Sequence, residues 1–189
     1  MKDNQHIVTA FDDDLSELNI SLQNLGKMAI TQFELSIDAL ATQHQNTLDK
    51  IIKDDVNLDD LEAAIHEKAL EIIAVRSPLA QDLRHVLVAL KVATILERTG
   101  DYARNIANRT KVIATAGNEN IPGVNIGRMG QVTRDMLQDV MRAYATRDAD
   151  KALDVWRRDI EVDHMHTAFY KEVLASMSRD PNVVATGAH

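Results

Sequence analysis

The sequence predicts an all-α protein made of tandem three-helix bundles, in which the second repeat lacks most of its third helix. Three observations support this fold class. Apolar residues recur at steps of three and four along most of the chain, aromatic residues make up only 4% of the composition, and the two halves match in register. Aliphatic cores with helical periodicity and no strand-like alternation are typical of helical bundles.

The first predicted helix begins near Asp12, and its pattern weakens at residues 43–46. The three aspartates at residues 12–14 favour a helix N-terminus, because the helix dipole is positive there. The apolar positions recur at helical steps: Leu15, Leu18, Leu22, Leu25, Ala29, Phe33, Ile37 and Leu40. A second helix is predicted at about residues 47–75, and it ends before Pro78 because proline disfavours helical backbone in the preceding residue.

Three further helices are predicted in the rest of the chain. The third begins at Pro78, since proline suits a first helical turn, and ends before Gly117, which fits the position after a helix end. Residues 117–128 form the longest loop-like stretch. The last two helices are predicted at residues 125–147 and 149–178, with a short junction between them.

An internal repeat relates the two halves of the chain. An offset of 104 residues takes Gly26 to Gly130 and also aligns the apolar positions without a gap. The matching apolar pairs are Phe33 with Leu137, Ile51 with Val155, Val56 with Ile160, Leu61 with Met165, and Ile65 with Phe169. Agreement of register along two whole helices indicates two copies of one helical unit.

The repeat predicts a first three-helix unit at residues 10–117 and a second, C-terminally incomplete unit at residues 125–189. Residues 180–189 resemble the start of the missing third helix. The second Glu-x-x-x-Asp motif is absent with it, so a second acidic site is half-built or completed by a dimer partner, or the chain is a shortened version of a longer protein. Because a missing helix would leave an apolar groove between the last two helices, we expect an oligomer or an exchanged segment that covers it.

Three pairs of acidic residues at four-residue spacing are the candidate functional residues. They are Asp55 with Asp59, Glu97 with Asp101, and Asp159 with Asp163. Two acids spaced in this way lie on one helix face and repel each other by a few tenths of a kcal/mol. Carboxylates gathered on neighbouring helices are costly unless cations share them, and such oxygen ligands bind iron, zinc, manganese or magnesium.

A solvated helix face is the alternative for any one pair, because 26% of the residues are charged. Two features favour a metal site. The pair Asp55 and Asp59 recurs in the second half of the chain at the same offset of 104 residues. The pair Glu97 and Asp101 continues an apolar helical stripe, and Gly100 lies between these two acids. Glycine inside a helix costs about 1 kcal/mol relative to alanine, so Gly100 predicts a close backbone contact, either a helix crossing or a cation site.

Composition argues against several other functions. The net charge is −8 and no dense basic patch occurs, so a nucleic-acid partner is not expected. The absence of cysteine excludes disulfides and thiolate metal sites. No run of 18 apolar residues and no signal peptide is present, so we expect a cytoplasmic protein that is not transmembrane.

A carboxylate-bridged di-metal enzyme is a less favoured alternative. Residues 161–164 have the Glu-x-x-His form that such helical bundles use, but this chemistry needs two copies of the motif. Residues 57–60, at the equivalent place in the first half, contain no histidine. No nucleophile elbow and no glycine-rich phosphate loop occurs, so the sequence predicts a protein that is not an enzyme.

Two segments resemble the PhoU family of bacterial phosphate-uptake regulators. They are KDDVNLDDLEAAIHEKAL at residues 53–70 and RSPLAQDLRHVLVALKVATILERTGDYARNIA at residues 76–107. The second segment has the family's proline and Asp-Leu-Arg at the entry of the third helix, followed by Glu-Arg-x-Gly-Asp and Asn-Ile-Ala. The resemblance covers about residues 10–180, and it includes the tandem three-helix plan.

The resemblance implies a homodimeric regulator that performs no catalysis. Such a protein restrains the phosphate ABC transporter and keeps its sensor histidine kinase in the repressing state when phosphate is plentiful. It also implies metal sites on acidic helix faces, with Asp55, Asp59, Glu97 and Asp101 in the first site and Asp159 and Asp163 as the remaining part of a second. An accessory protein of an ion-coupled phosphate transporter is the alternative within this resemblance.

Overall fold

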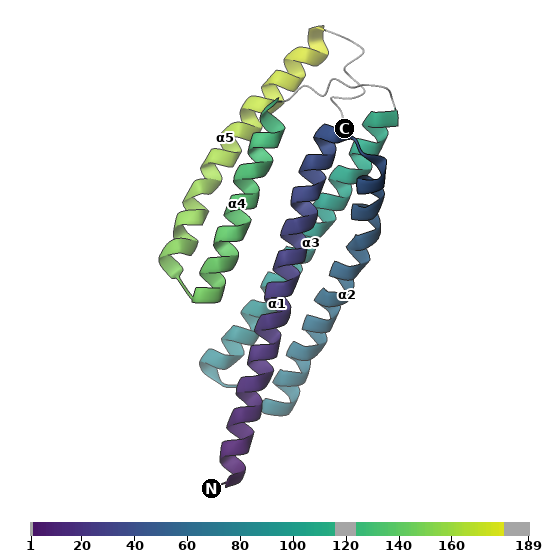
Figure 1. Cartoon of the computed structure of the whole chain (residues 1–189). Coiled ribbons are helices and arrows are strands. Elements are labelled where there is room, and N and C mark those ends of the chain that lie inside the picture. The colour runs from purple at the N-terminus through teal and green to yellow at the C-terminus, as the bar shows by residue number, and fades with distance from the viewer. Residues whose placement is uncertain (1, 116–123, 180–189) are drawn as a thin grey trace. The chain divides into compact units, whose positions relative to one another are not determined.

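The computed structural model describes residues 2–115 and 124–179, and this part of the chain contains five helices and no strand (Figure 1). The helices are α1 (Lys2–Thr42), α2 (Gln45–Arg76), α3 (Ala80–Thr115), α4 (Val124–Thr146) and α5 (Ala149–Arg179). The predicted all-α fold, with three helices followed by two, is therefore confirmed. No helix among the described residues combines the length and the apolar character that crossing a membrane requires.

The start of α1 differs from the prediction. The helix begins at Lys2, and the aspartates expected at its N-terminus lie in its interior. Asp14 instead accepts hydrogen bonds from Lys68 Nζ at 2.8 Å and from Arg76 Nε at 2.9 Å, both on α2. The bond from Lys68 is the main cause that lowers the pKa of Asp14. Asp14 therefore belongs to an ion-pair network between α1 and α2, and it does not interact with the dipole of a helix N-terminus.

Three helices end at residues with left-handed backbone that are not glycine. Gln43 after α1, Ser77 after α2 and Arg147 after α4 have φ angles of 52°, 46° and 56°. After α4, the N–H of Asp148 donates to the carbonyl of Ala143 at 2.9 Å, which is the bond of a Schellman cap. These caps satisfy helix-end carbonyls without the glycine that sequence patterns look for.

The other predicted boundaries are close to those observed. The third helix starts at Ala80, so Pro78 lies in the connection before it and not in its first turn. Helix α4 begins at Val124, one residue before its predicted start at residue 125, so the end of the loop-like stretch 117–128 is helical. The predicted end at Gly117 and the segment 180–189 lie outside the described residues.

The chain divides into two compact units. Unit 1 comprises Met1–Ala29 and Asp54–Asp101, and unit 2 comprises Ile30–Lys53 and Tyr102–His189. Helices α1, α2 and α3 each contribute to both units. This division by contacts is distinct from the repeats expected at residues 10–117 and 125–189, which stay a prediction.

The core of unit 1 joins large side chains of α1 and α2 to small side chains of α3. Its buried members are Leu18, Leu22, Leu25 and Ala29 on α1, Leu58, Ile65, Ala69 and Ile72 on α2, and Val86, Ala89, Ala93 and Leu96 on α3. Alanines on α3 let its backbone approach the other two helices. Full burial of a leucine or isoleucine contributes about 1.5–3 kcal/mol, so this core holds the candidate site in place.

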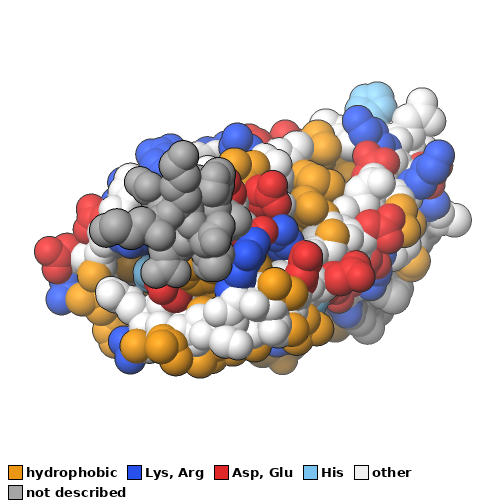
Figure 2. Space-filling view, turned by 90° about the horizontal axis from the view of Figure 1, so that it is seen from below, with side chains coloured by type: hydrophobic (Ala, Val, Ile, Leu, Met, Phe, Trp, Pro, Cys, Tyr) orange, Lys and Arg blue, Asp and Glu red, His pale blue; other side chains and the backbone are white. Residues whose placement is uncertain are grey.

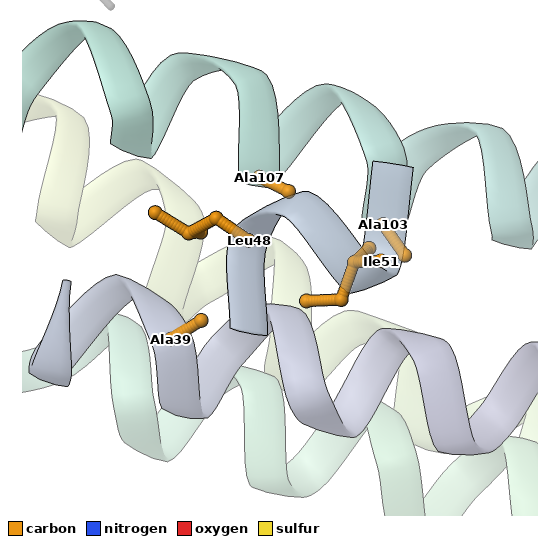
Figure 3. Packing of buried hydrophobic residues seen from close by; sticks show 5 residues of the cluster. All are labelled: Ala39, Leu48, Ile51, Ala103 and Ala107. Atoms are coloured by element: carbon orange, nitrogen blue, oxygen red, sulfur yellow. The ribbon is translucent and has the colours of Figure 1, made fainter. Parts of the chain in front are cut away.

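The core of unit 2 also draws on three helices. Ala39 of α1, Leu48 and Ile51 of α2, and Ala103 and Ala107 of α3 form one buried cluster (Figure 3). Three partly buried side chains, Phe33, Leu35 and Ile52, pack against this cluster.

The hairpin of α4 and α5 also belongs to unit 2. Arg158 of α5 donates to Asp139 of α4 at 2.8 Å, and this bond is the main cause that lowers the pKa of Asp139. On the outside of α5, Trp156 is 74% exposed and Ile160 is 60% exposed. Figure 2 likewise shows apolar side chains exposed beside charged ones on the face in view. These two apolar side chains of α5 are therefore open to solvent. The groove predicted between the last two helices stays a prediction.

Candidate functional site

The acidic residues predicted for the first site come together in unit 1. Asp55 and Asp59 lie on α2, and Glu97 and Asp101 lie on α3. The charges of Asp59 and Asp101 both act on the carboxyl of Glu97, so the acids of the two helices share one electrostatic environment.

A close contact at Gly100 sets the distance between the two helices. A Cβ atom placed on Gly100 would lie 3.0 Å from Cδ2 of Leu58 and 3.6 Å from Oδ1 of Asp55. Leu58 is fully buried, and Asp55 is only 3% exposed. The glycine therefore marks a helix crossing, at which a carboxylate of α2 also lies beside α3. A cation site at this contact stays a prediction.

The surroundings of Glu97 disfavour the ionised form of its carboxyl group relative to the protonated form. Burial is the largest cause that raises its pKa, followed by the charges of Asp101, Asp59 and Glu62 and by a hydrogen bond with Asp101. Like charges that lie close together at a partly buried position destabilise the folded protein, and a bound cation would offset this cost. The electrostatics of this cluster therefore fit a positively charged ligand.

The raised pKa gives a prediction for metal-free protein. Because the folded state binds the Glu97 proton more tightly than the unfolded chain does, the free energy of unfolding falls as pH rises from the usual glutamate pKa through the raised value. Glu97→Gln removes this titration. We therefore expect the stability of the variant relative to wild type to grow over that interval, measured by urea unfolding with chelator from about pH 4 to about pH 8. Parallel stability curves for both proteins would contradict the expectation.

Glu62 belongs to the acidic cluster, and the sequence interpretation missed it. Its Oε1 accepts a hydrogen bond from Thr94 Oγ1 at 3.1 Å and lies 3.0 Å from His66 Nδ1. The signal was available, because Glu62 follows Asp59 by three residues and Asp55 by seven, which places all three on one helix face. A search for pairs four residues apart does not find it.

The donor chemistry of the cluster fits a metal ion, although the side chains do not converge on one point. Carboxylate oxygens from two helices are the ligands that hard cations prefer. Among the residues that the structure describes, no group of three or more His, Asp or Glu side chains has an arrangement ready to hold a metal. Binding at this cluster would therefore require rotamer changes of the exposed members, around the buried Asp55.

The acids predicted for a second site lie apart from this cluster in the sequence and are exposed on α5. Asp159 and Asp163 are both solvent-exposed, and within the described residues no carboxylate of a second helix joins them in a ligand group. Glu161 and His164 line a pocket of about 450 Å³ with Arg128 of α4, and neither Asp159 nor Asp163 is part of its lining. The Glu-x-x-His string thus shares its pocket with an arginine, whose positive charge opposes a bound cation.

Comparison with known proteins identifies the relatives of this chain. The family model described as PhoU domain matches residues 22–110 and 126–187. The phosphate-specific transport system accessory protein PhoU homolog of Caulobacter vibrioides is 35% identical over 98% of this chain and 80% of its own length. The accessory protein PhoU of Escherichia coli is 32% identical over 96% of this chain and 75% of its own length.

Two solved structures resemble the fold. The crystal structure of PhoU from Pseudomonas aeruginosa has a TM-score of 0.91 and 27% identity, and the match covers 94% of this chain and 85% of that one. The phosphate transport system regulatory protein PhoU from Streptococcus pneumoniae has a TM-score of 0.84 and 26% identity, over 92% of this chain and 83% of that one.

Proposed function

We propose, from the premise that this chain belongs to the PhoU family, that it is a non-enzymatic accessory protein of a phosphate-specific transport system. In this proposal it restrains a phosphate ABC transporter and keeps a sensor histidine kinase in the repressing state when phosphate is plentiful. The names of its relatives, which are transport accessory and regulatory proteins, support the role at the transporter. The link to the kinase rests on the family resemblance in residues 53–70 and 76–107.

The proposal includes a metal site in unit 1. Asp55, Asp59, Glu97 and Asp101 would hold a divalent or trivalent ion, such as iron, zinc, manganese or magnesium. The single observation that carries this is the electrostatic cluster around Glu97, in which burial and the charges of Asp101, Asp59 and Glu62 raise the pKa of the Glu97 carboxyl. A bound cation would neutralise these carboxylates, and the chain's own contribution is to hold α2 and α3 at the separation that the Gly100 contact sets. Asp159 and Asp163 would be part of a second site.

We further propose a cytoplasmic homodimer. The support is the exposed apolar surface of α5, where Trp156 is 74% exposed and Leu174 is 45% exposed, because side chains of this size seldom stay in water as a group. Light scattering of the purified protein is expected to give the mass of a dimer. A monomer at all concentrations would contradict this part of the proposal.

A reporter of phosphate starvation tests the regulatory role. In a strain without its own accessory protein, this chain is expected to restore repression of the reporter in phosphate-rich medium. The variant Glu97→Ala with Asp101→Ala is expected to lose repression, whereas Asp12→Ala with Asp13→Ala, which removes two exposed acids of α1, is expected to keep it. Failure of the wild-type chain to restore repression in this strain would overturn the role.

An accessory protein of a sodium- or proton-coupled phosphate transporter is the second candidate. The fold and the acidic cluster would suit either partner. The neighbouring genes separate the two candidates, because an accessory protein of the ABC system is expected beside genes of that transporter and the kinase. The same reporter strain, with the ABC transporter deleted, should show no effect of the chain if the first candidate is right.

A further inference from the structure

One face of α3 in unit 1 carries basic and apolar side chains in the open. Leu87 is 51% exposed, Val88 is 43% exposed and Ile95 is 53% exposed. Three basic residues, Arg84, Lys91 and Arg98, are exposed on the same helix. We call these six residues the α3 outer face. It lies away from the buried positions of α3, such as Ala89 and Ala93, that pack in the core of unit 1.

Five of the six residues of the α3 outer face recur at a spacing of seven. Arg84, Lys91 and Arg98 are seven apart, and so are Val88 and Ile95, which lie between them along the helix. A seven-residue repeat keeps side chains in one seam along a helix, and such a seam is where a second helix packs. Charges beside the apolar positions of a seam select the partner by the opposite charge. The spacing therefore fits a helical occupant with acids at matching intervals.

The charge of the α3 outer face is opposite to that of the whole chain. The net charge is −8, yet residues 83–96 contain no aspartate or glutamate. Glu97, the next acid along α3, belongs to the cluster with α2. An anionic lipid surface would repel the negative protein as a whole. A partner helix can match the basic positions one by one, so charge and spacing together favour a protein.

We propose that the α3 outer face docks an amphipathic helix of a partner protein that presents carboxylates at seven-residue spacing beside apolar side chains. The proposal does not depend on the metal site, because the acids of that site lie on α2 and on the side of α3 that meets α2. It also does not depend on phosphate regulation, because binding is measured with the isolated protein.

A pair of designed peptides tests the docking surface. The first is a helix of about three heptads with leucine at the seam positions and glutamate beside them, and the second has lysine in place of each glutamate. We expect saturable binding of the glutamate peptide to the full chain, measured by fluorescence anisotropy, and no binding of the lysine peptide. The double variant Arg84→Glu with Lys91→Glu should bind the glutamate peptide at least about tenfold more weakly, because like charges then face each other. It should instead bind the lysine peptide.

The matched control is Arg157→Glu with Lys171→Glu, which reverses two exposed charges on α5. This variant should bind the glutamate peptide as wild type does. Equal binding of that peptide by wild type and by the Arg84 and Lys91 variant would overturn the proposal. So would binding to vesicles that contain phosphatidylglycerol together with no binding of either peptide, because the surface would then be one for lipid.

Discussion

Replacing Leu58 by alanine is expected to lower the free energy of unfolding by about 2–5 kcal/mol, the range for a leucine deleted from a packed core. The Leu58 side chain is fully buried, and it lies against Gly100 at the crossing of α2 and α3. Its removal leaves a cavity at that crossing, since the backbones cannot close up without moving other core side chains. Urea unfolding followed by circular dichroism measures the loss.

Val56→Ala is the matched control for the Leu58 variant. Val56 lies two residues away on the same helix and is 54% exposed, so its truncation is expected to change stability by no more than about 0.5 kcal/mol. If the two variants were equally stable, the crossing at Gly100 would not be the tight contact that the structure shows.

Replacing Gly100 by valine is expected to lower the free energy of unfolding by about 1–3 kcal/mol through overpacking. The first added carbon would already lie 3.0 Å from Cδ2 of Leu58, and the two methyl groups of valine extend further toward α2. Helix α2 has to move away or Leu58 has to leave its rotamer. Because Asp55 lies beside the same point, the variant should also disturb the acidic cluster.

Two other glycine variants make the Gly100 result specific. Gly127 on α4 has no atom within 4 Å of an added Cβ, so Gly127→Val should be neutral or slightly stabilising through helix propensity. The stability of Gly100→Ala should lie between that of Gly100→Val and that of wild type. Alanine gains about 1 kcal/mol in helix propensity, and the tight contact with Leu58 opposes this gain. If Gly100→Val were as stable as wild type, α2 would be able to move away at the crossing without a loss of folding free energy, which contradicts the tight contact.

The order and type of the helices could be predicted from the sequence, because apolar periodicity reports which face of each helix is buried. The start of α1 could not be predicted in the same way. Three aspartates in a row look like a helix N-terminus, but Asp14 pairs with Lys68 and Arg76, more than fifty positions away. The sequence also does not reveal the caps that follow α1, α2 and α4. Their left-handed residues are Gln43, Ser77 and Arg147, where sequence patterns expect glycine.

The acids of the first site could be predicted from their spacing, but their surroundings could not. Which residue of α2 meets Gly100 depends on the register between two helices, and only the structure shows that it is Leu58 with Asp55 beside it. Glu62 was missed because only acid pairs four residues apart were considered, and its hydrogen bond from Thr94 of α3 becomes visible only in the structure. For Asp159 and Asp163, the spacing, the internal repeat and the family resemblance predicted part of a second site, and in the described part of the chain no carboxylate of a second helix joins them in a ligand group.

Metal content measured by elemental analysis is the most direct test of the central claim, which is that the acids of α2 and α3 form a cation site in unit 1. Purified wild type, Glu97→Ala with Asp101→Ala, and Asp12→Ala with Asp13→Ala are loaded with metal, desalted and compared. The account predicts bound metal in wild type and in the Asp12 and Asp13 variant, and a loss of most of it in the Glu97 and Asp101 variant. Equal metal content in all three proteins would contradict the account.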